Sequence, residues 1–358
     1  MHPDPQGTGK EPGKTGNKNS LHFRDSYTCV LCIISIHFFY SSTHLASVAR
    51  YTISQAVPHL VQLFHNPDEI SARTPTTFLL SELIASARDS MDKAPSLMVE
   101  PPLLPFKDEV LGVLTAGSSL PATRTVALSG LRALVSTKGL LSDEELGFIV
   151  HHADQIIEKG ADYGDSRSSL SIILISLKLI FFTVSEAILD LLVAIGDRAP
   201  HHLAEQTLPL LFGYLPDKAP LREATAEREK CWLTLSTLRS LCLLPNLFEN
   251  MVIRLITKLD LISFPHAGQS LAVSDDLEPS AAYAHMILKT LAQTLGTKVK
   301  EKHTDVSKYI DRLVPSLFNI FVASAFISDE REMIATEPRL IQAAGEIITL
   351  VMQSLSIQ

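Results

Sequence analysis

Few residues of this 358-residue sequence could support metal or redox chemistry, and the most suggestive are Cys29 and Cys32, which form a Cys-x-x-Cys motif. A tetrahedral zinc site needs further ligands at a suitable spacing, and only His37 and His44 follow nearby. A redox Cys-x-x-Cys motif is expected within a βαβ unit, which this sequence does not predict. Four cysteines in total are too few for a disulfide framework, so small buried side chains are the favoured interpretation.

Two pairs of adjacent histidines offer imidazole ligands: His151-His152, with Asp154 close behind, and His201-His202. Neighbouring residues of a helix point about 100° apart, so His151 and His152 cannot easily share one ion. We expect His201 and His202 to face solvent at the start of a helix. The sequence therefore predicts no metal ligand, no catalytic residue and no cofactor-binding residue.

Sequence motifs typical of catalysis are also absent. Neither a phosphate-binding loop, a dinucleotide fingerprint, a nucleophile elbow nor a zincin motif occurs. With 31 Lys and Arg against 39 Asp and Glu, the chain has no basic stripe that would neutralise phosphates. We therefore predict a protein that is not an enzyme and that does not bind nucleic acid directly. The remaining enzyme hypothesis is a helical-repeat hydrolase or metal protein that uses Cys29, Cys32 and the histidines.

Helices must position whatever residues this protein uses, because apolar residues recur at spacings of three and four from Tyr51 onward. Ser142 and Glu145 form a capping box at one helix start. No stretch has the alternation of period two that predicts a strand. The apolar stripes include Cys231, Leu235, Leu238 and Cys242, and, near the end of the chain, Ile341, Ala344, Ile348, Val351 and Leu355. The fold class is all-α.

About twelve helices are expected, and alternate helices start about 45–50 residues apart, as in HEAT or armadillo repeats. The expected ranges are 51–64, 72–90, 106–116, 122–137, 143–158, 170–195, 201–215, 221–243, 246–261, 280–295, 306–326 and 337–355. Because a lone helix pair leaves one apolar face unburied, pairs stack into an α-solenoid of about six pairs. A plain helical bundle is the alternative.

A recurring order of prolines and charged residues, spaced by a whole number of repeats, favours the solenoid. Residues 57–73 have an early proline, then Pro67-Asp68 at the turn and Arg73 after it, and residues 208–222 repeat this order with Pro216-Asp217 and Arg222. Proline is tolerated in a first turn and stops a helix elsewhere. We expect the turn Asp and the following Arg to form hydrogen bonds between neighbouring units.

Residues 1–46 differ from the rest of the chain. The first twenty are rich in glycine and proline, which predicts disorder. Residues 26–49 carry no Asp, Glu, Lys or Arg, but their apolar centre is about 12 residues long, short of the ~20 that a membrane span needs. A second apolar block at 170–195 is interrupted by Lys178, Glu186 and Asp190, which favours one buried helix or two short ones.

The segment Thr207-Leu-Pro-Leu-Leu-Phe-Gly-Tyr-Leu-Pro-Asp-Lys-Ala-Pro220, with the helices over 235–261, resembles the HEAT-repeat scaffold of the cytosolic iron–sulfur assembly targeting complex. That family is also described as a nucleotide-excision-repair and RNA polymerase II transcription protein, and the resemblance is of fungal type. It runs from about Ile53 to the C-terminus, whereas residues before about 47 and parts of 166–183 depart from it. Family members are much longer, so residues 47–358 are expected to be a repeat array truncated at the C-terminus.

The resemblance implies a non-enzymatic adaptor with protein partners: subunits of the assembly complex and apo iron–sulfur enzymes of DNA metabolism. It implies no cofactor of its own, no membrane, and a place in cytoplasm and nucleus. A HEAT-repeat nuclear-transport receptor is the rival interpretation. Helical-wheel position, independently of the family, predicts a protein-binding surface at Glu229, Lys230, Thr237, Arg339, Glu346 and Gln353.

Two further groups on the sequence are interpreted as structural. The acidic cluster Asp275-Asp276-x-Glu278 is expected to be a solvated loop that could meet a basic partner. Trp232 lies beside the apolar stripe of its helix, and we expect it to pack there.

Overall fold

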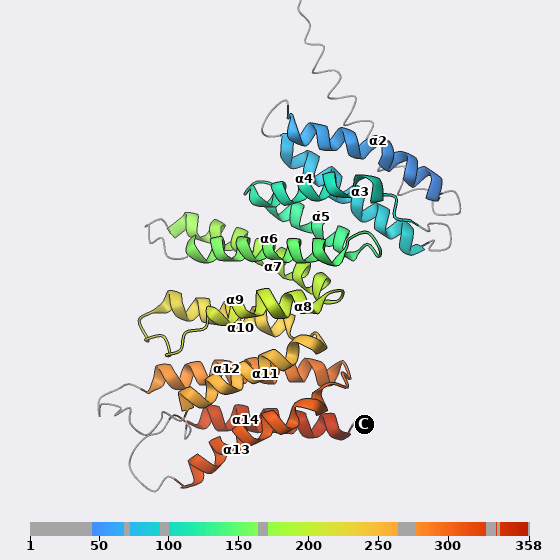
Figure 1. Cartoon of the computed structure of the whole chain (residues 1–358). Helices are drawn as coiled ribbons and strands as arrows, with labels where there is room; N and C mark the ends of the chain where they lie inside the picture. Colours follow the sequence, from blue (N-terminus) through green and yellow to red (C-terminus); the bar gives the residue numbers. More distant parts are fainter. Residues whose placement is uncertain are drawn as a thin grey trace, which may run out of the picture.

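The computed structural model describes residues 45–67, 72–93, 100–163, 171–263, 277–326, 334 and 337–356, and these contain helices and no strand (Figure 1). The longer helices are α2 (Leu45–His65), α3 (Arg73–Lys93), α4 (Lys107–Ser119), α5 (Arg124–Ser136), α6 (Asp143–Tyr163), α7 (Ser171–Gly196), α10 (Thr225–Leu241), α11 (Pro245–Ser263), α12 (Glu278–Lys300), α13 (Ile310–Phe326) and α14 (Pro338–Ser356). The shorter ones are η2 (Leu104–Phe106), α8 (Pro200–His202), η3 (Leu203–Thr207), α9 (Leu208–Gly213) and η4 (Val306–Tyr309). The all-α prediction is confirmed over these residues.

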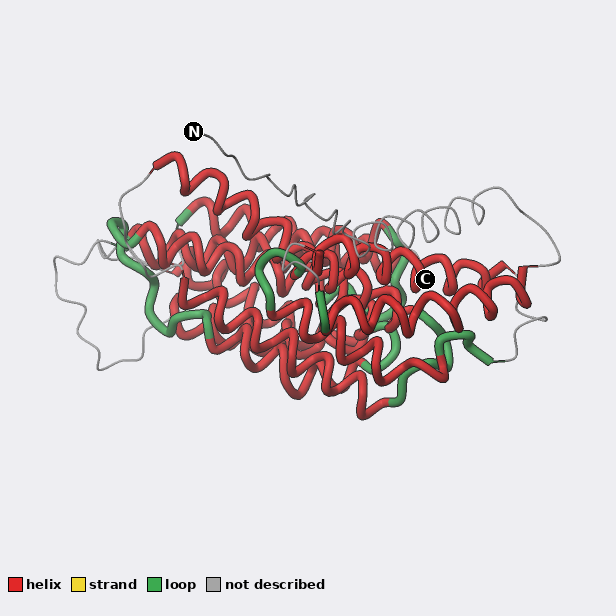
Figure 2. Tube along the Cα trace, turned by 90° about the horizontal axis from the view of Figure 1, so that it is seen from above, coloured by secondary structure: helices red, strands yellow, loops and turns green. Residues whose placement is uncertain are grey.

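The helices stack as pairs, from α2 and α3 at one end to α13 and α14 at the other (Figure 1). The first helices of the pairs (α2, α4, α6, α8 with α9, α11 and α13) form one row, and the second helices (α3, α5, α7, α10, α12 and α14) form another. Each helix packs against its partner and against the same-row helix of the next pair. Seen from above, the layers lie over one another (Figure 2). This is the predicted solenoid of six helical pairs.

The described helices match the twelve expected ranges with small changes. The block at 170–195 is one helix, α7, and not two. α10 starts at Thr225, four residues later than expected. No helix of the described residues is both long and apolar enough to cross a membrane. The expectations for the first 44 residues, disorder among them, lie outside the described part of the chain.

Apolar stripes of the helices form one continuous core. The predicted stripe of α10 is buried at Cys231, Leu235 and Leu238, with Cys242 directly after the helix. The stripe expected for α14 is partly wrong: Ile341 and Ile348 are half-buried and Leu355 is 50% exposed. The buried residues are Leu340, Ala343, Ala344, Ile347 and Val351, because α12 and α13 pack on a face turned by one residue.

The predicted capping box at the start of α6 is present. The Ser142 backbone N–H donates to Glu145 Oε2 at 2.7 Å, and the Glu145 N–H donates to Ser142 Oγ at 3.3 Å. Lys107 Nζ lies 2.7 Å from the other carboxylate oxygen, Glu145 Oε1. Ser142 therefore satisfies an orphan helix donor, and Asp143 stands at the first position of the helix.

The Asp-to-Arg bond expected at the turns is replaced by a different one. Asp217 Oδ1 is 3.1 Å from Nζ of Lys258, a residue of α11 in the next layer. The same Nζ donates to the carbonyl oxygens of Leu215 and Pro216, each at 2.9 Å. Of the other turn, Asp68 lies outside the described residues, and Arg73 Nε donates to Phe64 O at 3.3 Å. The recurring element is thus a cation on a backbone carbonyl at or just after the end of a helix.

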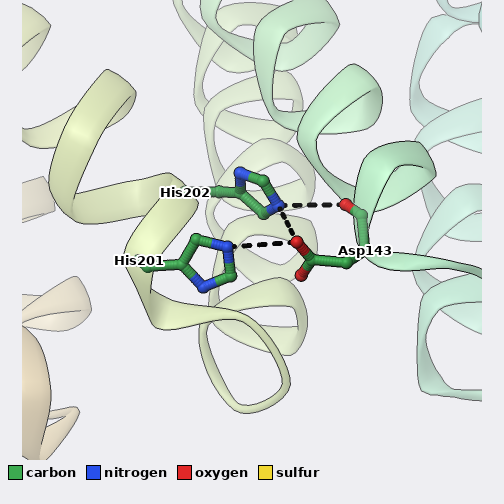
Figure 3. A group of neighbouring side chains, drawn as sticks. All are labelled: Asp143, His201 and His202. Atoms are coloured by element: carbon green, nitrogen blue, oxygen red, sulfur yellow. Dashed lines mark hydrogen bonds and ion pairs between the residues drawn. The ribbon is translucent and has the colours of Figure 1, made fainter.

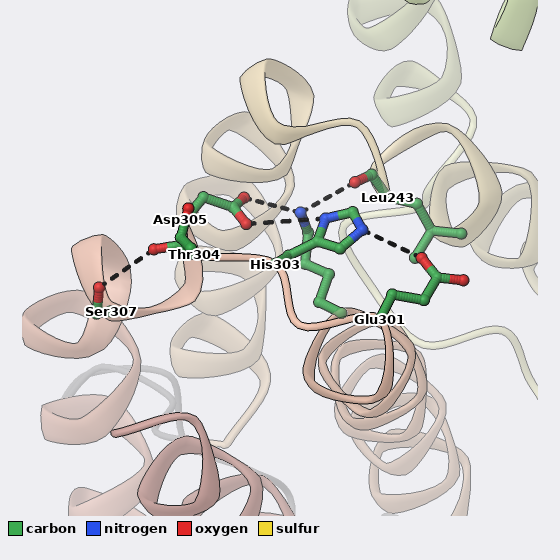
Figure 4. Close-up of polar contacts among 7 residues, drawn as sticks. Leu243, Glu301, His303, Thr304, Asp305 and Ser307 are labelled. Atoms are coloured by element: carbon green, nitrogen blue, oxygen red, sulfur yellow. Dashed lines mark hydrogen bonds and ion pairs between the residues drawn. The ribbon is translucent and has the colours of Figure 1, made fainter. Parts of the chain in front are cut away.

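Two more cations cap helix ends in the same way. Lys298, at the end of α12, is fully buried, and its Nζ donates to Leu243 O at 2.9 Å and to Asp305 Oδ2 at 2.7 Å (Figure 4). Arg198, after α7, donates through Nη1 to Val135 O at the end of α5. The last carbonyls of a helix lack partners within it and carry the negative end of its dipole, so Arg198 satisfies both at α5. Lys298 binds a carbonyl in the turn that follows α10.

The first-row helix of the fourth layer contains a π-turn. The Leu208 N–H donates to Leu203 O across η3, just before Pro209, which has no N–H to donate. Thr207 in this turn donates through Oγ1 to Oδ1 of the buried Asp154 on α6, at 2.9 Å. Burial raises the pKa of the Asp154 carboxyl to about 6. This contact joins α6 to the π-turn.

Gly130 of α5 provides a test of packing between layers. A Cβ there would lie 2.5 Å from Ser81 Oγ and 2.9 Å from Leu114 Cδ2, whereas a Cβ at Gly112 of α4 would meet nothing within 4 Å. We expect Gly130→Ala to lower the free energy of unfolding by about 1–3 kcal/mol through overpacking. Gly112→Ala should raise the free energy of unfolding by about 0.5–1 kcal/mol, because alanine favours a helix over glycine and its Cβ meets no clash there. Urea denaturation of both variants measures this; equal effects would contradict the packing.

Lys298→Met tests the buried cap, because it removes the cation and leaves the Asp305 carboxylate buried beside an apolar side chain. We expect a loss of about 3–5 kcal/mol in the free energy of unfolding, measured by urea denaturation. Lys308→Met, at an exposed lysine of η4, should change it by less than about 0.5 kcal/mol. The double variant Lys298→Met with Asp305→Leu should recover most of the loss. Similar losses for the two single variants would refute the cap.

Asp154 makes a prediction about pH. Its carboxyl, with a pKa of about 6 in the folded protein, is protonated more readily there than in the unfolded chain, where about 3.9 is normal. Unfolding free energy therefore falls as pH rises from about 4 to 6, by about 2–3 kcal/mol from this group. Asp154→Asn should lack this fall, while Asp92→Asn, at an exposed site of α3, should keep it. Urea denaturation at pH 4.5 and pH 7 measures the change. If Asp154→Asn lost as much unfolding free energy between these two pH values as the parent chain does, the idea would be wrong.

Candidate functional site

The six surface residues predicted from helical wheels lie on two second-row helices. Glu229, Lys230 and Thr237 are on α10, and Arg339, Glu346 and Gln353 are on α14. Five of them are exposed, while Thr237 is half-buried. α12 stands between α10 and α14 and packs against both, so the two groups share the second row without touching each other. Whether they bind a partner stays a prediction.

The cations of this set have partners within the chain. Lys230 Nζ lies 4.7 Å from the centroid of the Tyr214 ring, a cation–π contact. Arg339 Nε is 2.8 Å from Glu337 Oε1, and its Nη1 is 4.0 Å from Glu278 Oε1. A partner that used these two side chains would compete with the present contacts.

Glu278 does not lie in a solvated loop as predicted. It is the first residue of α12, is half-buried, and has Arg222 Nε at 3.6 Å as well as Arg339 nearby. A carboxylate in the first helical turn is stabilised by the helix dipole, and here two arginines add to that. The other members of the acidic cluster, Asp275 and Asp276, lie outside the described residues.

Trp232 is the residue whose surroundings the sequence analysis misjudged. Its side chain is 47% exposed and the next one, Leu233, is 54% exposed, so neither packs in the core. The reason is angular: Cys231 faces inward, and each further residue turns by about 100° around the helix. Lys289 Nζ of α12 lies 6.0 Å from the centroid of the indole ring. In the sequence, the only signal for this exposed Trp-Leu pair beside Glu229 and Lys230 is that it falls between the stripe residues of α10.

A hollow of about 380 Å³ opens between the C-terminal parts of α10 and α12. Its lining residues are Arg239, Ser240, Leu243, Gln293, Gly296, Thr297 and Lys300. Arg239 Nη1 donates to Gln293 Oε1 at 2.8 Å, which fixes the guanidinium at the rim. With one arginine and one lysine and no acidic side chain in its lining, the hollow suits a carboxylate of a partner.

Asp143, His201 and His202 form a compact group where α6 and α8 begin (Figure 3). Nε2 of each histidine lies 3.3 Å from Asp143 Oδ2. His202 Nε2 is also 2.9 Å from the Asp143 backbone oxygen. The expectation of two solvent-facing histidines is wrong for His202, whose side chain is only 14% exposed, while His201 is 50% exposed. The missed partner, Asp143, belongs to the capping-box sequence and is 58 residues away from His201.

The remaining candidates for chemistry do not come together. His152 Nε2 lies 2.6 Å from Ser118 Oγ, and Asp154 accepts its hydrogen bond from Thr207. Cys231 and Cys242 are buried, and burial raises the pKa of both thiols, which makes them poor nucleophiles and poor ligands. Cys29 and Cys32 lie outside the described residues.

Comparison with known proteins gives one result that bears on function. Residues 234–358, from within α10 through α14, match the family described as RNAPII transcription regulator C-terminal, the C-terminal part of MMS19. A comparison with curated proteins finds no match. The matched residues contain the whole lining of the basic hollow and the α14 surface, whereas Trp232 and the histidine group precede them. Over residues 234–358 the chain is thus similar to the family that the sequence resembles, and the match covers about a third of its length.

Proposed function

We propose that this chain is a non-enzymatic adaptor that recruits apo-proteins to the cytosolic iron–sulfur cluster assembly machinery and so supports DNA repair, replication and transcription. The family match over residues 234–358 is the observation that carries the proposal. The paired helical rows support it, because a solenoid exposes long helix faces on which several proteins can bind at once.

The partners of such an adaptor are proteins. They are the subunits of the assembly complex on one side and apo iron–sulfur enzymes of DNA metabolism on the other. Direct contact with nucleic acid is disfavoured by the net charge of −8, since phosphate binding needs basic side chains. These partners place the adaptor in the cytoplasm and the nucleus.

The outer side of α10 is the best candidate for a binding surface. It combines exposed apolar area at Trp232 and Leu233 with the charged Glu229 and Lys230, and the basic hollow lies further along the same helix. Interfaces commonly have an aromatic centre with a polar rim, and Trp is enriched among the residues that dominate binding energy. The α14 residues Arg339, Glu346 and Gln353 would extend this surface along the second row.

A nuclear-transport receptor is the second candidate, because such receptors are also arrays of helical pairs. Affinity capture of the tagged full chain from cell extract separates the two. Subunits of the iron–sulfur assembly complex and apo iron–sulfur enzymes would support the adaptor, whereas the small transport GTPase would support the receptor and overturn the adaptor.

Trp232→Ala is expected to reduce capture of those partners by about tenfold or more, because a half-exposed tryptophan at an interface centre accounts for a large part of the binding energy. Quantitative mass spectrometry of captured partners at matched bait levels measures the change.

Phe78→Ala is the matched control for this prediction. Phe78 is 50% exposed and lies on α3, another second-row helix far along the stack from α10. Both substitutions remove an exposed aromatic ring, so both should leave the unfolding midpoint nearly unchanged. Equal capture by the two variants would mean that α10 does not contribute to binding.

A further inference from the structure

We propose that Asp143, His201 and His202 form a zinc site that joins α6 to α8. The geometry, and not the family, points to it: three potential ligands from two segments converge on one point, with all ligand atoms within 4.8 Å of one another (Figure 3). The site lies outside residues 234–358, so this proposal is independent of the proposed adaptor function.

The two separations between the carboxylate and the imidazoles fit one tetrahedral ion. Donors bound to zinc at about 2.0–2.1 Å in a tetrahedron stand about 3.3–3.4 Å apart. Asp143 Oδ2 is 3.3 Å from both imidazole Nε2 atoms. These separations are longer than those of a strong charge-assisted hydrogen bond, which is typically about 2.7–2.9 Å. Both Asp-to-His separations therefore match those of donors around a zinc ion, and the third separation is within 4.8 Å.

The two segments hold the ligands in place before any ion arrives. The capping box formed by Ser142 and Glu145 fixes the start of α6 and with it Asp143. Gly147, one turn further along α6, makes room for His202: a Cβ at that position would lie 2.8 Å from His202 Cε1. Glycine inside a helix costs about 1 kcal/mol relative to alanine, and the close approach of the imidazole is a physical reason for it here.

Adjacent histidines converge here because α8 is the first turn of its helix and the carboxylate reaches across from α6. The imidazole rings of His201 and His202 lie close, with centroids 4.1 Å apart and an angle of 40° between their planes. The 100° turn between helix neighbours does not keep these two side chains apart, because the Nε2 atoms of both lie near the same carboxylate oxygen, Asp143 Oδ2.

Two imidazoles and one carboxylate are ligands that Zn²⁺ accepts, with a fourth position left for water. His201, half exposed, leaves a path for the ion. Binding requires the Nε2 atom of His202 to give up the proton that it donates to the Asp143 carbonyl at 2.9 Å, so the neutral ring must carry its proton on Nδ1. A bound ion would clamp the third layer to the fourth.

The test begins with the full chain, treated with a chelator that is then removed. Isothermal titration calorimetry with ZnCl₂ alone measures binding, and thermal unfolding measures the effect of zinc on stability. We expect one Zn²⁺ per chain at this site and a Tm that rises with zinc concentration. His201→Ala and Asp143→Asn should each weaken zinc binding by at least about tenfold, since loss of even an outer-shell partner costs that much. Gly147→Ala should weaken it as well, by displacing the His202 ring.

His151→Ala is the matched control, because His151 is an exposed histidine of the same helix α6 and lies outside the group. It should bind zinc as the parent chain does. All titrations are repeated with Cys29→Ser and Cys32→Ser in place, so that the Cys-x-x-Cys motif cannot supply the signal. Absence of zinc binding in that background, or equal affinity of the parent and His201→Ala, would overturn the proposal.

Discussion

Cationic side chains that bind backbone carbonyls at or near helix ends link successive layers of this array. The ends of α5, α9 and α10 are covered by the next layers, so their last carbonyls cannot all rely on water. Arg198 donates to such a carbonyl, Val135 O of α5. Lys258 and Lys298 instead donate to carbonyls just after a helix, those of Leu215 after α9 and Leu243 after α10. Each bond runs backward along the stack, from a later layer to an earlier one. A charged donor is worth more than a neutral one at the negative end of a helix dipole, which explains why cations recur there.

Beside charged residues such as Lys230 and Arg339, the outer faces of the second-row helices carry exposed apolar side chains. On α10 these include Trp232 and Leu233, which the core does not need. Exposed apolar side chains of this size beside charged ones are a typical composition for a protein-binding surface. The inner stripes support the stack, and the outer stripes of the same helices are available for partners.

Two regions of the chain are distinguished by different observations. The family match begins within α10 and runs through α14, and the adaptor proposal depends on it. The Asp143–His201–His202 group lies earlier, between the third and fourth layers, where η3 interrupts the regular helix and Asp154 is buried. These polar contacts thus lie at a junction where the first-row helix is irregular. A zinc ion there would add a further link between the third and fourth layers.

The sequence by itself determined the helices, their pairing and the buried face of α10, because spacings of three and four residues directly set which side chains share a helix face. It also determined the capping box, a local motif of four residues. It did not determine which cation meets which turn: Asp217 contacts Lys258, and not Arg222, because the partner is chosen by how layers stack. The same is true of Asp143 and His201, which are brought together across 58 residues, and of Trp232, which is exposed although it adjoins the buried stripe of α10. Contacts within one turn follow from local chemistry, whereas contacts between layers depend on the offset of one helix against another, which only the tertiary structure decided.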